Sequence, residues 1–198
     1  STRDWSSDVC SSDLLVAHGT ITRVLVDRER FHARSVPGLV IRQAVPGEFA
    51  AVGDLCVGAY FQGEAMARDG DSYAAVLRDV AGRAESGMVL VALAEGRLVG
   101  TASTFADDSP WAEIAGPGEM EFRFLAVEPD SWRRGIARAL MADVVRRADG
   151  RDLVCSVIEG NDPAHALYRD LGFRRDPDRD RWPTEGIWLQ AYRTSARD

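Results

Sequence analysis

The chain has 198 residues, of which 45% are hydrophobic and 28% charged, values typical of one folded globular domain rather than a disordered chain. The net charge of −7 argues against nucleic acid as a partner, because nucleic-acid-binding surfaces carry an excess of positive charge. No apolar run reaches the length of about 18 residues that predicts a membrane span. The three cysteines are far apart and lack ligands at metal-binding spacing, so we expect no metal and a reducing, cytoplasmic location.

The first 37 residues differ in composition from the rest. The opening run STRDWSSDVCSSDL is rich in Ser and Asp, has no hydrophobic period and resembles translated sequencing-adapter read-through. We therefore expect residues 1–37 to be a poorly structured or non-native extension. Residues 38–198 are expected to form the folded domain.

From residue 38 onward, the hydrophobic pattern predicts alternating strands and helices. In chain order these are a strand at 38–45, helices at 49–59 and 73–86, a hairpin at 88–106, a strand at 119–127, a helix at 136–148, a strand at 153–158, a helix at 162–172, and strands at 173–176 and 186–193. The segments 61–72, 107–119 and 176–186 are expected to be loops. This order predicts an α/β protein with a mixed sheet and helices on both of its faces.

The turn in LAVEPDSWRRGIARALM, residues 125–141, lies between the most strand-like run of the chain and a helix. Glycine and small residues leave the backbone of such a turn accessible, and the start of a helix carries partial positive charge. One interpretation is that an anion such as a diphosphate binds the amides of the turn, which belong to Arg133, Arg134, Gly135, Ile136 and Ala137. The alternative is an ordinary strand-to-helix turn with solvated arginines.

A second motif, IEGNDPAHALYRDLGF, covers residues 158–173. Asn161 follows a predicted strand, Tyr168 shares a helical face with apolar residues, and Gly172 ends the helix. The alternative to a functional role is that Asn161 caps the helix and Tyr168 only packs. We expect Cys155, inside an apolar strand, to be a core residue, and His165 to be solvated.

Together, FRFLAVEPDSWRRGIARALM and NDPAHALYRDLGF resemble the acyl-CoA-binding motif and the following helix motif of the GNAT superfamily of N-acyltransferases. The resemblance extends over roughly residues 38–194. It implies a mostly antiparallel central sheet with a splayed pair of parallel strands, and acetyl-CoA as co-substrate. In the family the turn reads Q/R-x-x-G-x-G/A. Trp132 occupies the Q/R position here, a departure that bears on side-chain binding of the diphosphate but leaves the amides available.

The resemblance also implies two catalytic residues. Glu121 is the candidate general base that takes a proton from the acceptor amine, and simple pairing with Arg123 or solvent is the alternative. Tyr168 is the candidate acid for the leaving thiolate, and core packing is the alternative.

The central strand is expected to contact coenzyme A through its backbone. An amide of Leu125 or Ala126 is expected to meet the oxyanion, and pantetheine is expected to pair like an added strand along Leu125, Ala126 and Val127. Asn161 is expected to hydrogen-bond the pantetheine or the strand end. Strict alternation predicts one face with Glu121, Arg123 and Leu125, and the other with Phe122, Phe124 and Ala126.

These features predict an N-acetyltransferase that moves an acetyl group from acetyl-CoA to a primary amine of a small molecule or peptide by direct attack in a ternary complex. Two alternatives stay open: transfer of a longer acyl group, and a non-catalytic CoA-binding regulatory module. A homodimer is compatible with the sequence. Aromatic and acidic residues of the three loops are expected to shape the acceptor site, among them Tyr60, Phe61, Glu64, Trp111, Glu113, Glu119 and Trp182.

Overall fold

The computed structural model describes residues 36–61 and 70–194. Residues 1–35, which make up most of the expected N-terminal extension, lie outside the described residues. Among the helices of the described residues, none has the length and apolar character that a membrane crossing needs. The elements are, in chain order, β1 (Leu39–Gln43), the 3-10 helix η1 (Pro46–Glu48), α2 (Phe49–Tyr60), α3 (Gly70–Arg78), α4 (Val80–Ser86), β2 (Met88–Ala94), β3 (Arg97–Ala106), β4 (Met120–Val127), η3 (Pro129–Ser131), α5 (Ile136–Ala148), β5 (Leu153–Ile158), α6 (Asp162–Asp170), β6 (Arg174–Arg175), η4 (Pro177–Arg179), β7 (Arg181–Thr184) and β8 (Ile187–Arg193).

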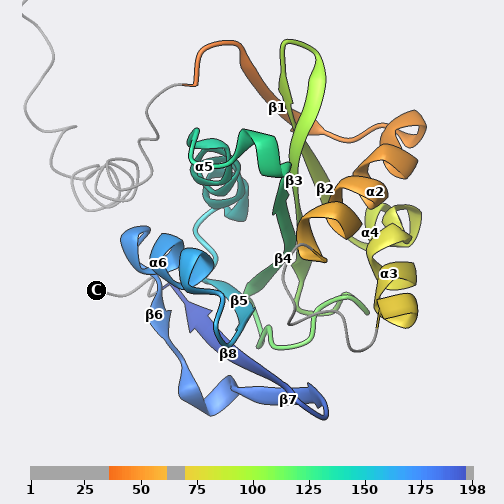
Figure 1. The fold of residues 1–198 in the computed structure, drawn as a ribbon. Coiled ribbons are helices and arrows are strands. Elements are labelled where there is room, and N and C mark those ends of the chain that lie inside the picture. Colours follow the sequence, from red (N-terminus) through yellow and green to blue (C-terminus); the bar gives the residue numbers. More distant parts are fainter. Residues whose placement is uncertain (1–35, 62–69, 195–198) are drawn as a thin grey trace, which may run out of the picture.

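The described strands form one sheet in the order β1-β2-β3-β4-β5-β8-β6, and β7 also pairs with β8. All neighbouring strands are antiparallel except β4 and β5, which are parallel. Helices α5 and α6 cover one face of the sheet, and α2, α3 and α4 cover the other (Figure 1). The expected α/β fold, with a mostly antiparallel sheet between helices, is therefore confirmed.

Apolar layers hold the helices to both faces of the sheet. Leu140 of α5 is fully buried on one face, and Cys56 of α2 is fully buried with Phe105 of β3 on the other. Gly100 of β3 lets α5 approach closely, because a Cβ atom at this position would lie 3.1 Å from side-chain carbons of both Ile136 and Leu140. The helix that follows the candidate turn is thereby fixed directly on the sheet.

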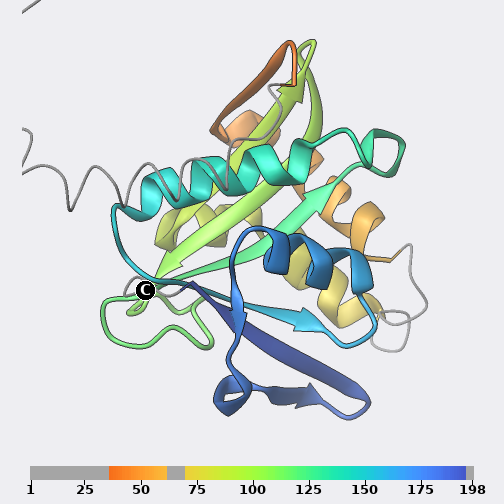
Figure 2. The same ribbon diagram turned by 90° about the vertical axis from the view of Figure 1, so that its left-hand side faces the viewer.

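Strands β4 and β5 separate soon after they begin to pair. Their parallel register contains only Met120 opposite Leu153 and Glu121 opposite Val154. Beyond these pairs the two strands diverge as a V, and the remainder of β4 keeps β3 as its strand partner (Figure 2). The expected splayed pair is therefore present. Among the described residues, the edge of β4 that faces the V has no strand partner beyond Glu121, and such an edge can pair with an extended ligand.

The helix expected over residues 73–86 is instead two helices, α3 and α4, which are separated at Asp79. The Asp79 carboxylate caps α4 by accepting a hydrogen bond of 2.9 Å from the Gly82 amide. Leu77 and Val80, on either side of the break, are both fully buried. The hydrophobic pattern therefore continues across the break, and periodicity alone did not reveal it.

The segment 176–186, expected to be a loop, contains η4 and strand β7. β7 pairs with β8 from Arg181 opposite Leu189 to Thr184 opposite Ile187. Its side chains are mostly exposed, and it therefore lacks the apolar alternation by which a strand is recognised in sequence.

Candidate functional site

The last backbone amides of the turn between β4 and α5 have no acceptor among the described residues. Arg133 and Gly135 both lie in the left-handed region, with φ of 63° and 86°. Alternation between left- and right-handed residues directs successive N–H groups to the same side. None of the N–H groups from Arg133 to Arg138 donates a hydrogen bond to another described residue, and α5 begins within this run. The amides of the turn are therefore available to an anion at the positive end of a helix.

Few described atoms lie close to Gly135. A Cβ atom built on Gly135 would have one described neighbour within 4 Å, a methyl carbon of Val36 at 3.5 Å. Next to the turn lies the edge of β4 for which the described part of the chain supplies no strand partner. A diphosphate joined to an extended chain with amide groups matches both features, and coenzyme A has this chemistry.

Trp132 differs in its contacts from the glutamine or arginine expected at its position. Its indole Nε1 donates a hydrogen bond of 2.7 Å to the carbonyl oxygen of Val127, at the end of β4, and the side chain is half exposed. The indole therefore fastens the turn to the strand. It also takes up one backbone acceptor that a chain lying along β4 would otherwise use.

A β-bulge interrupts the alternation expected along β4. The register against β3 shifts within the strand, and Phe124 has a positive φ of 55°. As a result, Phe122 and Leu125 pack on the face of α5 and α6, whereas Phe124 and Ala126 pack on the face of α2. The expected grouping of Phe122 with Phe124 and Ala126, and of Leu125 with Glu121, is therefore wrong.

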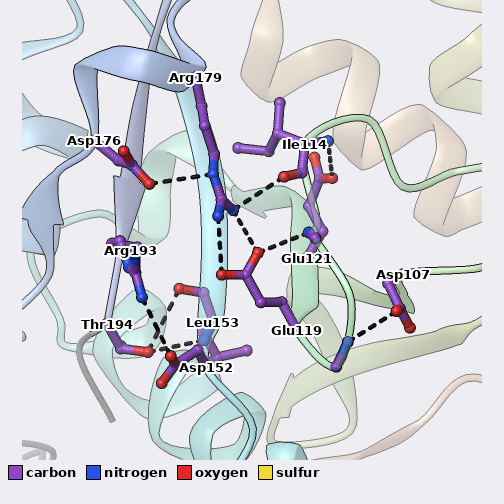
Figure 3. A network of polar contacts seen from close by, with 12 residues as sticks. Asp107, Ile114, Glu119, Glu121, Asp152, Leu153, Asp176, Arg179, Arg193 and Thr194 are labelled. Carbon is purple, nitrogen blue, oxygen red and sulfur yellow. Dashed lines mark hydrogen bonds and ion pairs between the residues drawn. The ribbon is translucent and has the colours of Figure 1, made fainter. Parts of the chain in front are cut away.

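Glu121 lies at the apex of the V, because it is the last residue of β4 that pairs with β5. Its carboxylate is 1% exposed, and Oε2 accepts a hydrogen bond of 2.6 Å from the amide of Glu113. The same oxygen accepts a hydrogen bond of 2.8 Å from the amide of Ile114 (Figure 3). Oε1 is also buried but has no hydrogen-bond partner among the described residues; Nε of Arg123 lies 3.9 Å away. One oxygen therefore anchors the carboxylate, and the other can accept a proton.

Burial raises the pKa of the Glu121 carboxyl above its ordinary value, although the amide hydrogen bonds and the charge of Arg123 act in the opposite direction. A carboxylate with a raised pKa is a stronger base near neutral pH. Arg123 is not simply a partner for Glu121, because its Nη1 donates 2.8 Å to the Trp111 carbonyl and its Nη2 lies 2.9 Å from Glu113. The role of Glu121 as a base stays a prediction.

Tyr168 approaches the apex from the opposite face of the sheet. Its ring packs edge-on against Phe122, the residue after Glu121, with ring centroids 5.4 Å apart. The phenol makes no hydrogen bond with another described residue. Burial, followed by the nearby Cys155 and Tyr60, raises the pKa of Tyr168 well above its ordinary value. The phenol therefore stays protonated at neutral pH, as a proton donor must.

The residues around α6 divide into confirmed and wrong expectations. Cys155 is a free, buried cysteine, as expected. Asn161 caps α6, because its Oδ1 accepts a hydrogen bond of 3.3 Å from the backbone amide of Ala164. Contact between Asn161 and pantetheine stays a prediction. His165, expected to be solvated, is buried: Nδ1 lies 2.8 Å from the Tyr192 hydroxyl and Nε2 lies 3.2 Å from the carbonyl of Ile158. The partner that buries it is 27 residues away, beyond any local pattern.

Of the residues expected to shape the acceptor site, Tyr60, Phe61 and Trp111 pack against one apolar cluster, whereas Trp182 is exposed and lies beside Trp188. Trp111 packs against Phe105, with centroids 6.1 Å apart, and Glu119 is ion-paired with Arg179. Glu64 lies outside the described residues. Arg179, which contacts the loop before β4, was missed altogether. It belongs to the charged run DPDRDR, which has no motif, and its partners lie about 60 residues earlier.

The fold and the turn together define the class of protein: an α/β protein whose central parallel strands separate beside a turn at the start of a helix. The profile of the acetyltransferase (GNAT) family matches residues 49–173, more than half of the chain. The chain therefore belongs to the GNAT family of acetyltransferases, which use acetyl-CoA. The matched range includes β4, the turn, β5 and α6.

Individual relatives agree with this family. Over 82 residues the chain is 34% identical to the N-alpha-acetyltransferase RimI of Mycobacterium tuberculosis, a match that spans 41% of this chain but only 46% of that relative's length. Among solved structures, yncA from Salmonella typhimurium with its cofactor acetyl-CoA has a TM-score of 0.58 at 20% identity, covering 81% of this chain and 95% of that one. The ribosomal-protein-alanine N-acetyltransferase from Brucella melitensis has a TM-score of 0.57 at 23% identity, covering 78% and 98%. At these identities the solved structures establish the fold.

Proposed function

We propose that this protein is an N-acetyltransferase of the cytoplasm that moves an acetyl group from acetyl-CoA to a primary amine by direct attack in a ternary complex. The observation that carries the proposal is the apex of the V. There, Oε1 of Glu121 and the phenol of Tyr168 lie on opposite faces of the sheet, and neither has a hydrogen-bond partner among the described residues. Membership of the GNAT family supports the same chemistry.

Three groups of residues hold acetyl-CoA in this proposal. Bound there, acetyl-CoA supplies an activated acetyl thioester. The diphosphate is bound by the backbone amides of Arg133, Arg134, Gly135, Ile136 and Ala137. The pantetheine lies along the open edge of β4, at Leu125, Ala126 and Val127, with the side-chain amide nitrogen of Asn161 as a further donor.

Glu121 and Tyr168 handle the two protons of the reaction. An ammonium acceptor cannot attack a thioester, so Glu121 takes one proton from it, and general-base help of this kind contributes a factor of about 10²–10⁴. The raised pKa of Glu121 favours this transfer near neutral pH. After the amine attacks, its nitrogen must lose a second proton while the C–S bond breaks. Tyr168 donates its proton to the departing sulfur, which would otherwise leave as a thiolate, and the proton from the nitrogen restores the phenol; the proton on Glu121 then passes to solvent. The turn, the strand edge and these two side chains also hold the reacting groups together, which lowers the entropic cost of the encounter.

The acceptor proposed first is the N-terminal amine of a peptide. This choice rests on the relative that carries the name N-alpha-acetyltransferase. A small-molecule amine is the second acceptor, because the catalytic groups recognise only the amine and the thioester.

The direct test is thiol release from acetyl-CoA, measured with a panel of N-terminal peptides and small primary amines. We expect acceptor-dependent release of free coenzyme A together with an acetylated product of the matching mass. Binding of acetyl-CoA without turnover of any acceptor would contradict the proposal and favour a CoA-binding regulatory module. Faster turnover with longer acyl thioesters than with acetyl-CoA would favour the alternative donor.

A further inference from the structure

The two amides that anchor Glu121 belong to the loop between β3 and β4. This loop is held from outside by the segment that contains η4 and β7. Arg179 of η4 donates a hydrogen bond of 3.1 Å to the carbonyl oxygen of Ile114, and the N–H of the same residue binds Glu121 (Figure 3). Ile114 therefore has two contacts: its carbonyl oxygen accepts a hydrogen bond from Arg179, and its amide donates one to the Glu121 carboxylate.

Arg179 also contacts this loop at Glu119. Its guanidinium binds both carboxylate oxygens of Glu119, and Glu119 in turn accepts a hydrogen bond of 2.7 Å from the Gly116 amide. Burial acts to raise the pKa of Glu119, but the hydrogen bonds from Arg179 and Gly116 lower it overall, so the carboxylate stays charged at neutral pH. Nε of Arg179 also lies 3.2 Å from Asp176. The side chain therefore has partners on three sides.

Arg181 of β7 acts on the neighbouring residue of the loop. Its guanidinium pairs with the side chain of Glu113, whose backbone amide is the other donor to Glu121. The Glu113 carboxylate is shared with Arg123 of β4, at 2.9 Å. Each of the two residues whose amides hold the carboxylate therefore also contacts an arginine of the η4–β7 segment, Glu113 through its side chain and Ile114 through its carbonyl oxygen.

The η4–β7 segment is itself fixed to the sheet. Asp180, between the two arginines, forms a paired contact of 2.8 and 2.6 Å with Arg175 of β6. It also accepts a hydrogen bond of 2.8 Å from the Ala191 amide of β8. Arg179 and Arg181 therefore belong to a segment that is fixed to the sheet, and through their contacts they fix the loop as well.

We propose that Arg179 and Arg181 are positioning residues that set the orientation and burial of the Glu121 carboxylate by holding the loop at the carbonyl oxygen of Ile114 and at the side chain of Glu113. This inference rests on the proposed function for its catalytic consequence, but its structural part can be tested without turnover. Neither arginine contacts Glu121, so each acts through the loop backbone.

The loop that the arginines hold supplies the two hydrogen bonds to the buried carboxylate. Charged and titratable groups around Glu121 are Glu113 from the loop, Arg123 from β4 and Cys155 from β5. Releasing the loop removes the burial and the amide hydrogen bonds together. Because their combined effect raises the pKa of Glu121, release should return it downward toward its ordinary value.

The experiment compares the wild type with Arg179→Lys and Arg179→Ala. Lysine keeps the charge beside Glu119 but cannot span Ile114 and both carboxylate oxygens at once, which preserves the fold while breaking the arginine's hold on the loop. We expect amide hydrogen exchange in residues 107–119 to accelerate by about tenfold or more in both variants. The carboxyl resonance of Glu121, assigned by its loss in Glu121→Gln, should titrate at lower pH in Arg179→Lys.

The matched control is Arg42→Ala, which removes another paired arginine–glutamate contact, with Glu48, at the β1 edge of the sheet. It should leave exchange in 107–119 and the Glu121 titration unchanged. Unaltered exchange or an unaltered Glu121 titration in both Arg179 variants would overturn the inference.

Turnover measurements distinguish a failure of this inference from a failure of the proposed function. The acid limb of the kcat/KM profile of Arg179→Lys should move to lower pH together with the Glu121 titration, and kcat should fall more than KM rises. If Glu121→Gln keeps full turnover, the base role fails, whereas exchange and titration still decide whether the arginines position Glu121.

Discussion

Tyr168 of α6 packs edge-on against Phe122 of β4, with ring centroids 5.4 Å apart, at the point where β4 and β5 separate. The same ring lies 5.7 Å from Phe173 and 6.0 Å from Tyr192. Three aromatic neighbours therefore fix the ring, while the hydroxyl has no hydrogen-bond partner among the described residues. The packing role and the proposed chemical role reside in different atoms of one side chain.

This separation predicts the effect of Tyr168→Phe. The substitution keeps every ring contact, so the free energy of unfolding should change by less than about 1 kcal/mol. Turnover should fall by at least about tenfold, because the departing thiolate loses its proton donor, whereas the Kd for coenzyme A should stay the same. Steady-state kinetics and calorimetric binding measure the two effects separately.

Tyr192→Phe is the matched control for this prediction. The Tyr192 hydroxyl lies 2.8 Å from Nδ1 of His165, so its removal should lower stability by about 1 kcal/mol without changing turnover. Equal turnover in the two variants would show that the Tyr168 hydroxyl has no part in catalysis.

The turn before α5 predicts a second pair of variants. Gly135→Ala places a side chain at φ 86°, which costs about 1–2 kcal/mol in the left-handed region, and adds a methyl group within the turn proposed to bind the phosphate. Gly96→Ala, in the β2–β3 turn at φ 77°, carries a similar backbone cost with no described atom within 4 Å of the new carbon. We expect similar losses of melting temperature in both variants.

Affinity for coenzyme A should distinguish these two glycines. Gly135→Ala should raise the Kd by about tenfold or more, since even one lost amide contact to a charged group is worth about 1.5–3 kcal/mol. Gly96→Ala should bind as the wild type does. A wild-type Kd for Gly135→Ala, measured by calorimetry, would remove the turn from the binding site.

Substitution of Trp132 by arginine is expected to strengthen coenzyme A binding, whereas Gly135→Ala is expected to weaken it. Trp132→Arg places a guanidinium beside the amides of the turn and releases the Val127 carbonyl from the indole. We expect coenzyme A to bind about three- to tenfold more tightly at low salt, and the gain to shrink as ionic strength rises. Trp132→Phe, which removes the N–H but adds no charge, should show no such salt dependence. Weaker binding by Trp132→Arg would indicate that the indole itself contributes to the ligand site.

The local sequence pattern predicts some parts of the candidate site but not others. The turn around Gly135 and the helix with Tyr168 were predicted because their residues lie close together in the sequence. The bulge at Phe124 was not, since it depends on how β4 pairs with β3. Arg179 and the burial of His165 were also not found, because their partners come from segments about 60 and 27 residues away. Contacts between residues so far apart in the chain produce no periodic pattern of hydrophobic residues that could reveal them.

The raised pKa of Glu121 predicts how stability depends on pH. The folded protein binds this proton more tightly than the unfolded chain, so the carboxylate lowers stability as pH rises from its ordinary value, 4.5, through the higher folded value. Glu121→Gln keeps an oxygen for the two amides and removes the charge. The variant should therefore gain stability relative to the wild type as pH rises through this window, while its acetyl transfer falls by about 10²–10⁴.

Glu48→Gln should show the opposite sign of pH dependence. Hydrogen bonds from Arg42 lower the pKa of Glu48 to about 2, so its contribution to stability is complete above the ordinary value of 4.5 and is lost as pH falls toward 2. Relative to the wild type, Glu48→Gln should thus lose stability as pH rises from 2 to 4.5, with acetyl transfer unchanged at pH 8. Melting temperatures of the three proteins between pH 2 and 8 measure both slopes. A Glu121→Gln slope of the same sign as that of Glu48→Gln would mean that hydrogen bonding, and not burial, dominates at the apex of the V, and Glu121 would then be too weak a base for the role proposed here.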